Sequence, residues 1–226
     1  MPDLEKAENP FYFSTRLILR ELTGKKARNL RELLQLIKTV PGSVIYNHTH
    51  QFLQQHIYLS PEPPNDFAYW VREFLKEDEL AERLTSIDTC AFATIRDLRN
   101  EIVKTIKKHI ARAKRSVGSV RPGSEFNFIR AYSFVVPTPY IANDLGEFLD
   151  CIEKISVYSL YFHMFESRLR LEKGTNDFSF WLGTSLNEVE LAEEISRLDP
   201  YTYTLEDLRG ELAKKIEKHL KWKKEE

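Results

Sequence analysis

Polar side chains that could do chemistry are concentrated between residues 46 and 70, a segment that holds three of the six histidines of the chain. Histidine commonly serves as a general acid or base near neutral pH, while carboxylate or tyrosine groups orient it or donate to it. A cluster of this kind would bind a polar ligand or transfer protons. The candidate residues are His48, His50, His56, Tyr58, Glu62, Asp66 and Trp70.

Helical geometry argues against a metal site formed by the same histidines. The segment 44–59 has the pattern of a helix, in which His48 and His50 would point about 200° apart. His48 and His56 would be separated by about 12 Å along the helix axis. Neither pair has the i, i+4 spacing of helical zinc sites, and the motifs GxxxxGK[ST], GxGxxG, GxSxG and HExxH are absent from the sequence. We therefore expect no metal and no other cofactor.

Much of the chain recurs in its second half, which indicates an internal duplication. Residues 11–48 match residues 126–163 at an offset of 115 with ten identities. The segment NDFAYW at 65–70 recurs as NDFSFW at 176–181. Self-similarity in a fixed order is typical of a fold that is built from two copies of one unit.

The duplication separates two kinds of candidate residue. His48 recurs as His163 and Trp70 recurs as Trp181, so a packing role with satisfied nitrogens explains both residues. A role for His48 in a site stays open beside it.

His50 and His56 behave differently, because their counterparts are the apolar residues Phe165 and Leu171. A buried imidazole costs free energy unless it is hydrogen-bonded or used, so a site would lie where the two halves differ. The proline-rich joint SPEPP at 60–64 is a second difference, and it is either a stiff spacer or part of the rim of that site.

The helical spacing of apolar residues predicts a mainly α fold: an internally duplicated helical bundle with about five helices per half around a pseudo-twofold axis. We expect a first helical repeat at 11–115, a linker at 116–125 and a second helical repeat at 126–226, packed as one globular unit. Alternating residues at Phe11–Leu19 and Phe126–Val136 are compatible with a short two-stranded β-ribbon. Either segment could instead be a first helix.

The composition argues against several classes of partner. The chain has 226 residues, with 33 basic and 34 acidic residues and a net charge of −1, so nucleic acid and anionic membranes are not generally attracted. No apolar run approaches the roughly 18 residues that span a bilayer. The two cysteines, Cys90 and Cys151, lack the spacing of a disulfide framework, which favours a reducing, cytoplasmic setting.

Two helical segments nevertheless carry many cations, which are typical of solvated helix faces but could also bind phosphate groups or nucleic acid. These cations are Lys104, Lys107, Lys108, Arg112, Lys114 and Arg115 in the first repeat and Lys214, Lys215, Lys218, Lys221, Lys223 and Lys224 in the second.

The segments FYFSTRLILRELTGKKARNLRELL, YNHTHQFLQQHIYLSPEPPNDFAYW and SIDTCAFATIRDLR resemble an uncharacterised prokaryotic family, a domain of unknown function. The block HTHxFLQQHxYLSPEPPNDFAYW is the most specific part of the resemblance, which covers nearly the whole chain. It implies a full-length family domain and brings no catalytic residues, cofactor or activity.

The function predicted from these features is a non-catalytic binding or regulatory module. It would dock a partner protein or a small ligand in a groove of the first repeat or between the repeats. The alternative is an enzyme that uses the His/Tyr/carboxylate cluster of the first repeat for general acid–base chemistry. A weaker alternative is binding of a phosphate-rich ligand or nucleic acid by the basic helix faces. The sequence leaves a homo-oligomer open.

Overall fold

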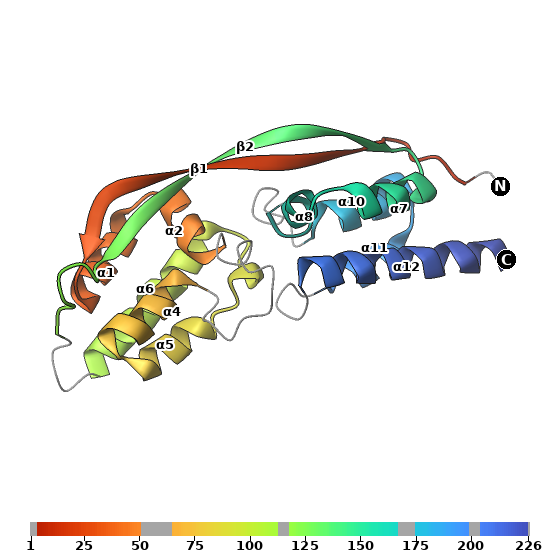
Figure 1. The fold of residues 1–226 in the computed structure, drawn as a ribbon. Helices are drawn as coiled ribbons and strands as arrows, with labels where there is room; N and C mark the ends of the chain where they lie inside the picture. The colour runs from red at the N-terminus through yellow and green to blue at the C-terminus, as the bar shows by residue number, and fades with distance from the viewer. Residues whose placement is uncertain (1–3, 51–64, 113–117, 167–174, 199–203, 226) are drawn as a thin grey trace. The chain divides into compact units, whose positions relative to one another are not determined.

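The computed structural model describes residues 4–50, 65–112, 118–166, 175–198 and 204–225 (Figure 1). Helices predominate in it, and its two strands form one sheet. The predicted mainly α, duplicated fold is thereby confirmed.

The described chain divides into two compact units. Unit 1 contains the described residues up to Leu17 and from Phe134 onward, and unit 2 contains those from Ile18 to Ser133. The strands are β1 (Phe11–Ala27) and β2 (Phe126–Ala142).

Each unit contains five α-helices among its described residues. Those of unit 2 are α1 (Leu30–Thr39), α2 (Gly42–Thr49), α4 (Asp66–Trp70), which continues as a π-helical turn (Val71–Leu75), α5 (Asp78–Thr85) and, after a 3-10 turn (Thr89–Ala91), α6 (Ile95–Arg112). Those of unit 1 are α7 (Leu145–Lys154), α8 (Val157–Tyr161), which continues as a π-helical turn (Phe162–Glu166), α10 (Asp177–Ser185), α11 (Val189–Ser196) and α12 (Leu205–Glu225).

Equivalent residues begin equivalent helices in the two units. Asn29 caps α1 and Asp144 caps α7, each accepting hydrogen bonds from N–H groups of the first turn. The carboxylates of Glu32 and Glu147 accept from the backbone N–H of the residue before each cap, at 2.9 and 2.8 Å. This reciprocal arrangement satisfies N–H groups that a helix start otherwise leaves unpaired.

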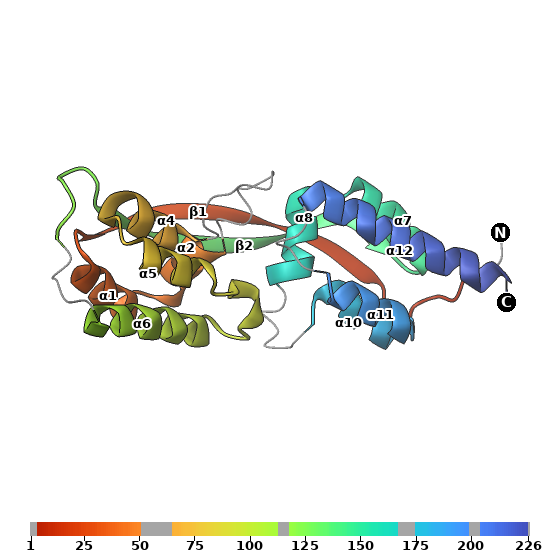
Figure 2. The same cartoon turned by 90° about the horizontal axis from the view of Figure 1, so that it is seen from below.

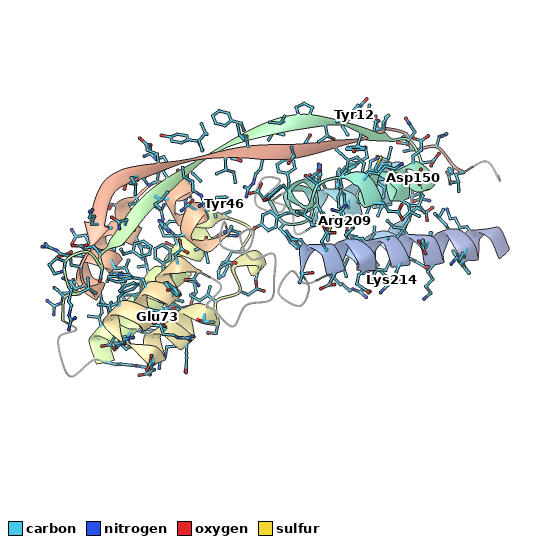
Figure 3. The ribbon with its side chains drawn as sticks, in the orientation of Figure 1. Tyr12, Tyr46, Glu73, Asp150, Arg209 and Lys214 are labelled. Atoms are coloured by element: carbon cyan, nitrogen blue, oxygen red, sulfur yellow. The ribbon has the colours of Figure 1, made fainter. Side chains whose placement is uncertain are left out.

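Equivalent arginines close the other ends of these helices. Arg99 of α6 donates to the carbonyl oxygen of Val40, just after α1, at 2.7 Å. Arg209 of α12 donates to the carbonyl oxygens of Ile152 and Ile155 at the end of α7, at 2.6 and 2.7 Å (Figure 3). A cation beside the last carbonyl groups of a helix favourably meets its dipole.

Both strands belong partly to each unit: β1 begins in unit 1 and ends in unit 2, and β2 does the reverse. They are hydrogen-bonded neighbours and lie side by side in both views (Figures 1 and 2). The hydroxyl group of Thr138 donates to the carbonyl oxygen of Phe13 in unit 1, and that of Thr23 donates to the carbonyl oxygen of Phe128 in unit 2, both at 2.7 Å. The two pairs run in opposite order along the chain, so the strands are antiparallel.

The strand prediction is confirmed and the helical alternative for these segments is wrong. Both strands extend beyond the expected ends at Leu19 and Val136, to Ala27 and Ala142. The boundaries between the compact units fall within the strands. The division of the sequence into repeats at 11–115 and 126–226 with a linker at 116–125 stays a prediction. Packing of the two repeats as one globular unit stays a prediction.

Candidate functional site

His48 lies in the interior of unit 2 with both ring nitrogens hydrogen-bonded. Its ring is 2% exposed. The backbone N–H of Ile129 donates to Nε2 at 2.9 Å, so Nε2 is the acceptor and Nδ1 carries the ring proton. Nδ1 donates in turn to a carboxylate oxygen of Asp66 at 2.7 Å. The imidazole therefore links the start of α4 to the backbone of β2.

Trp70 joins the same cluster through β2. It is 3% exposed, and its indole N–H donates to the carbonyl oxygen of Ser124 at 2.8 Å. Its ring lies 5.8 Å from that of Phe126, which lies 4.7 Å from the ring of His48. The structure thus brings His48, Asp66 and Trp70 together, in an arrangement that matches the packing interpretation of His48 and Trp70.

The same arrangement exists in unit 1. The backbone N–H of Ser14 in β1 donates to Nε2 of His163 at 2.8 Å, and Nδ1 of His163 lies 2.8 Å from a carboxylate oxygen of Asp177. The indole N–H of Trp181 donates to the carbonyl oxygen of Asn9 at 2.7 Å. In both units, therefore, a carboxylate and an imidazole hold a strand from the other repeat, and an indole holds the residues just before that strand.

His50 belongs to a different set of contacts. It is the residue just after α2, is 2% exposed, and its Nδ1 lies 2.8 Å from the hydroxyl group of Thr49. Its ring stacks on that of Tyr46 with 5.2 Å between centroids.

The remaining members of the predicted cluster, His56, Tyr58 and Glu62, lie outside the described residues. The helix expected over 44–59 ends at Thr49 in its described part, and residues 51–64 lie outside the described ranges too. A working site formed by the whole cluster stays a prediction.

A groove that the cluster did not include lies in unit 2, between α5, the 3-10 turn and α6, and has a volume of about 450 Å³. The residues that line it are Arg83, Ser86, Ile87, Asp88, Ala91, Phe92, Glu101, Thr105 and Lys108. This volume falls within the range of about 300–1,000 Å³ that is usual for small-molecule sites.

The charges in the groove are unequally paired. Arg83 donates to Glu79 at 2.6 Å and Lys104 donates to Glu101 at 2.7 Å. Within the described ranges, the ammonium group of Lys108 makes no hydrogen bond or ion pair. An unpaired ammonium group beside apolar walls can attract an anionic group of a ligand.

The second repeat has an ion pair at the corresponding positions. Arg83 corresponds to Glu194 and Thr105 corresponds to Lys215. Nζ of Lys215 lies 3.0 Å from a carboxylate oxygen of Glu194, and this hydrogen bond lowers the pKa of Glu194. The first repeat lacks the two residue types that form this pair, and this difference between the repeats is the sequence signal that points to the groove.

A buried ion pair in unit 1 was also missed. Arg16 of β1 and Glu166 pair in the interior, each 8% exposed, and the guanidinium lies over the ring of Tyr161 at 5.7 Å. The first repeat has Gln51 in place of Glu166, and the second strand has Ala131 in place of Arg16. Alignment of the repeats marks this difference, but only the structure shows that the two residues meet.

Other charged groups in the part of the chain that the structure describes show no further site. Two matched pairs, His109 with Glu77 at 3.0 Å and His219 with Glu188 at 2.7 Å, join α6 and α12 to the segments before α5 and α11. No group of three or more His, Cys, Asp or Glu residues that could hold a metal exists in the described part of the chain. No described helix is long and apolar enough to span a membrane.

Comparisons with known proteins identify a family of unknown function and a similar solved structure. A family model described as "Family of unknown function (DUF5752)" matches residues 8–217. The chain is similar to a solved structure, OrfY from Thermoproteus tenax, with 33% identity, coverage of 96% of this chain and 98% of that chain, and a TM-score of 0.81. No curated protein matches.

Proposed function

Because the chain belongs to the DUF5752 family, whose function is unknown, we propose from its geometry that it is a binding module for a small organic anion. The observation that carries the proposal is the groove of unit 2, which has the volume of a small-ligand site and is lined in part by Lys108.

The lining of the groove indicates the class of ligand. Ile87, Ala91 and Phe92 offer an apolar wall, while Thr105 on α6 can donate a hydroxyl hydrogen bond beside Lys108. Of the acidic groups, Glu101 is neutralised by Lys104. A ligand with a carboxylate, sulfonate or phosphate group on an apolar body matches both the apolar wall and the polar groups of this groove.

The acid–base alternative receives no support from His48. Its Nε2 accepts from Ile129 and its Nδ1 donates to Asp66, so proton transfer to a substrate would first break one of these bonds.

The proposal can be tested with 8-anilinonaphthalene-1-sulfonate as the anionic probe and N-phenyl-1-naphthylamine as its neutral analogue. Saturable fluorescence enhancement by the anionic probe, with about tenfold weaker binding after Lys108→Met, is the expected result. The matched control is Lys218→Met at the corresponding position of α12, which should leave binding unchanged. Equal loss in both variants, or equal affinity for the neutral probe, would contradict the proposal.

A second pair of variants uses the difference between the repeats. The double variant R83E/T105K places in the groove the residues that form the ion pair in unit 1, and should abolish binding of the anionic probe. The reciprocal variant E194R/K215T changes the same positions in unit 1 and should leave binding intact. Retained binding by R83E/T105K would place the probe elsewhere and would overturn the proposal.

A further inference from the structure

Residues 4–17, which we call the leader, complete the core of unit 1 although they precede the first repeat's helices in the sequence. Phe11 and Phe13 are 7% and 1% exposed, and their rings lie 5.6 and 5.5 Å from that of Phe148. Phe11 also contacts the ring of Trp181 at 5.5 Å. The leader thus fills an aromatic cradle that is formed by helices of the second repeat.

Backbone hydrogen bonds hold the leader along its length. Besides the bonds of Ser14 and Asn9 to His163 and Trp181, the N–H of Ala7 donates to the carbonyl oxygen of Asn143 at 2.7 Å.

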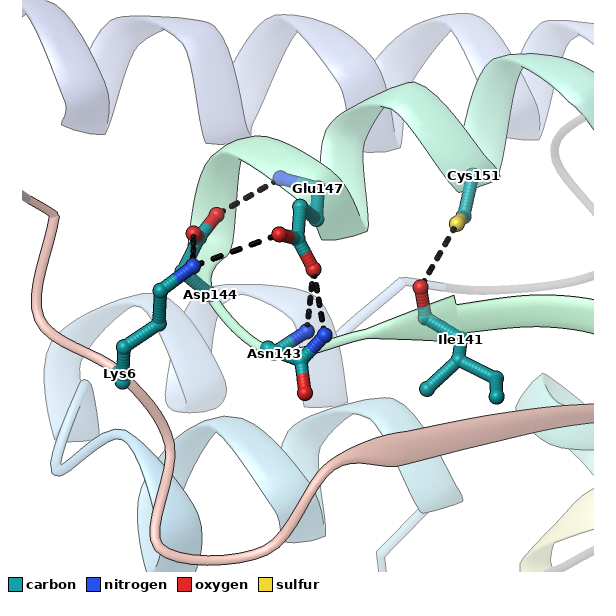
Figure 4. Close-up of polar contacts among 6 residues, drawn as sticks. All are labelled: Lys6, Ile141, Asn143, Asp144, Glu147 and Cys151. Carbon is teal, nitrogen blue, oxygen red and sulfur yellow. Dashed lines mark hydrogen bonds and ion pairs between the residues drawn. The ribbon is translucent and has the colours of Figure 1, made fainter. Parts of the chain in front are cut away.

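Near the start of the leader, Nζ of Lys6 lies 2.6 Å from Asp144 and 3.3 Å from Glu147 at the beginning of α7 (Figure 4). The pKa of Lys6 is raised, chiefly by its hydrogen bond to Asp144. The leader therefore meets its cradle through apolar, backbone and ionic contacts.

Every one of these contacts is non-covalent, and the leader continues through β1 into unit 2 between Leu17 and Ile18. The cradle makes the same contacts with any copy of the leader, because nothing in it depends on which chain supplies the segment. We propose that the cradle of unit 1 accepts the leader of a second copy of this chain, in a strand-exchanged pair.

Unit 2 provides an independent argument. There the N–H of Ile129 donates to His48, the indole of Trp70 donates to Ser124, and the ring of Phe126 lies 5.1 Å from that of Phe67. Each unit thus has an equivalent cradle, and each cradle accepts a segment from the other repeat. Exchange between repeats is how this chain completes both cores, and exchange between chains uses the same surface.

The chain's own leader competes through its high effective concentration, of the order of millimolar. A second copy therefore enters when the chain's own leader binds weakly or when the protein is near millimolar concentration. The double variant F11A/F13A weakens the chain's own leader and leaves the cradle residues intact. A fluorescent peptide of residues 4–17 should bind this variant and not the unchanged protein.

Two controls define that experiment. A peptide with both phenylalanines replaced by alanine should bind at least about 100-fold more weakly, since the aromatic contacts supply most of the affinity. The matched variant F126A/F128A, altered at the corresponding positions of β2, should not bind the 4–17 peptide, because its unit 1 cradle remains filled. Absence of peptide binding to a folded F11A/F13A variant would overturn the proposal.

The full-length test mixes F11A/F13A with Trp181→Ala, which has an intact leader and an impaired cradle. At about 100 μM, native mass spectrometry should detect a one-to-one complex of the two variants, because the intact leader of Trp181→Ala can fill the intact cradle of F11A/F13A. If circular dichroism shows F11A/F13A to be unfolded, unchanged protein in two isotopic forms is warmed together to its thermal midpoint and cooled. Formation of mixed-isotope dimers by the unchanged protein, but not by Trp181→Ala treated in the same way, supports the exchange. Absence of mixed-isotope dimers from the unchanged protein overturns it.

Discussion

The backbone N–H of Ser14 donates to Nε2 of His163, 149 positions later in the sequence, at 2.8 Å. Because Asp177 holds the opposite nitrogen, the imidazole is fixed as an acceptor toward the strand. The identical relation between Ile129, His48 and Asp66 in unit 2 makes these histidines structural anchors of the exchanged strands.

Replacing His163 by phenylalanine should lower the free energy of unfolding by about 1–3 kcal/mol, because it preserves an aromatic ring but leaves the partly buried N–H of Ser14 without its acceptor. Urea denaturation measures the effect, and the loss of hydrogen-exchange protection should centre on Ser14. His48→Phe is the matched variant, with the loss centred on Ile129. A change below about 0.5 kcal/mol would show that the hydrogen bond does not anchor the strand.

The carboxylate of Asp144 makes stability depend on pH. Burial acts to raise its pKa, but the hydrogen bonds from Lys6 and from the N–H of Glu147 outweigh burial and lower the pKa below its ordinary value. A lowered carboxylate pKa stabilises the fold above pH 4, and this contribution is lost as pH falls through the folded-state value.

Asp144→Asn tests this contribution, because asparagine is the cap at the corresponding Asn29 and keeps the capping geometry. The variant should lose about 0.5–1 kcal/mol at pH 7, and its difference from the unchanged protein should shrink toward zero below the folded-state pKa. Urea titrations at several pH values measure both. A difference independent of pH would contradict the assignment.

Breaking the buried pair of Arg16 and Glu166 should be costly. Glu166→Gln leaves the guanidinium inside without that carboxylate, and we expect a loss of about 3 kcal/mol. The double variant R16A/E166Q gives unit 1 the residue types of the corresponding Ala131 and Gln51, and should be more stable than E166Q alone. Thermal denaturation compares them, and an equal or greater loss in the double variant would contradict this account.

Cys151 should react slowly while the protein is folded. It is 8% exposed, its thiol lies 3.7 Å from the carbonyl oxygen of Ile141, and burial raises its pKa, so little thiolate is present at neutral pH (Figure 4). In a Cys90→Ser background, alkylation by iodoacetamide at pH 7.5 should be at least about tenfold slower than in urea. Equal rates in both conditions would show that the thiol is accessible.

The duplication and the main helices could be predicted because local signals mark them. The caps at Asn65, at Thr94 and at its counterpart Thr204 are read directly from side chains that bond their own first turn. The full length of the strands could not be predicted, because β1 passes through Gly24, which has a φ of 73° and resembles a turn in sequence. Pro137 is tolerated in β2 because a two-stranded sheet has only edge strands.

The candidate site was predictable only in part, because repeat alignment shows which positions match but not which strand fills which unit. Alignment distinguishes the matched His48 from the unmatched His50, yet the partner of His48 on β2 is a backbone amide, which no side-chain pattern reveals. Arg83 and Thr105 line the groove at the positions where the second repeat has an ion pair, a difference that becomes meaningful only once α5 and α6 are seen to pack together.

The crossing of the strands also limits how the chain can be shortened. A fragment that ends between α6 and β2 would keep the helices of unit 2 without Phe126 and Phe128, and would carry Phe11 and Phe13 with no helices to cover them. The complementary fragment would have the opposite deficit. A gene divided between the two repeats would therefore yield two incomplete polypeptides that regain their cores only by meeting each other.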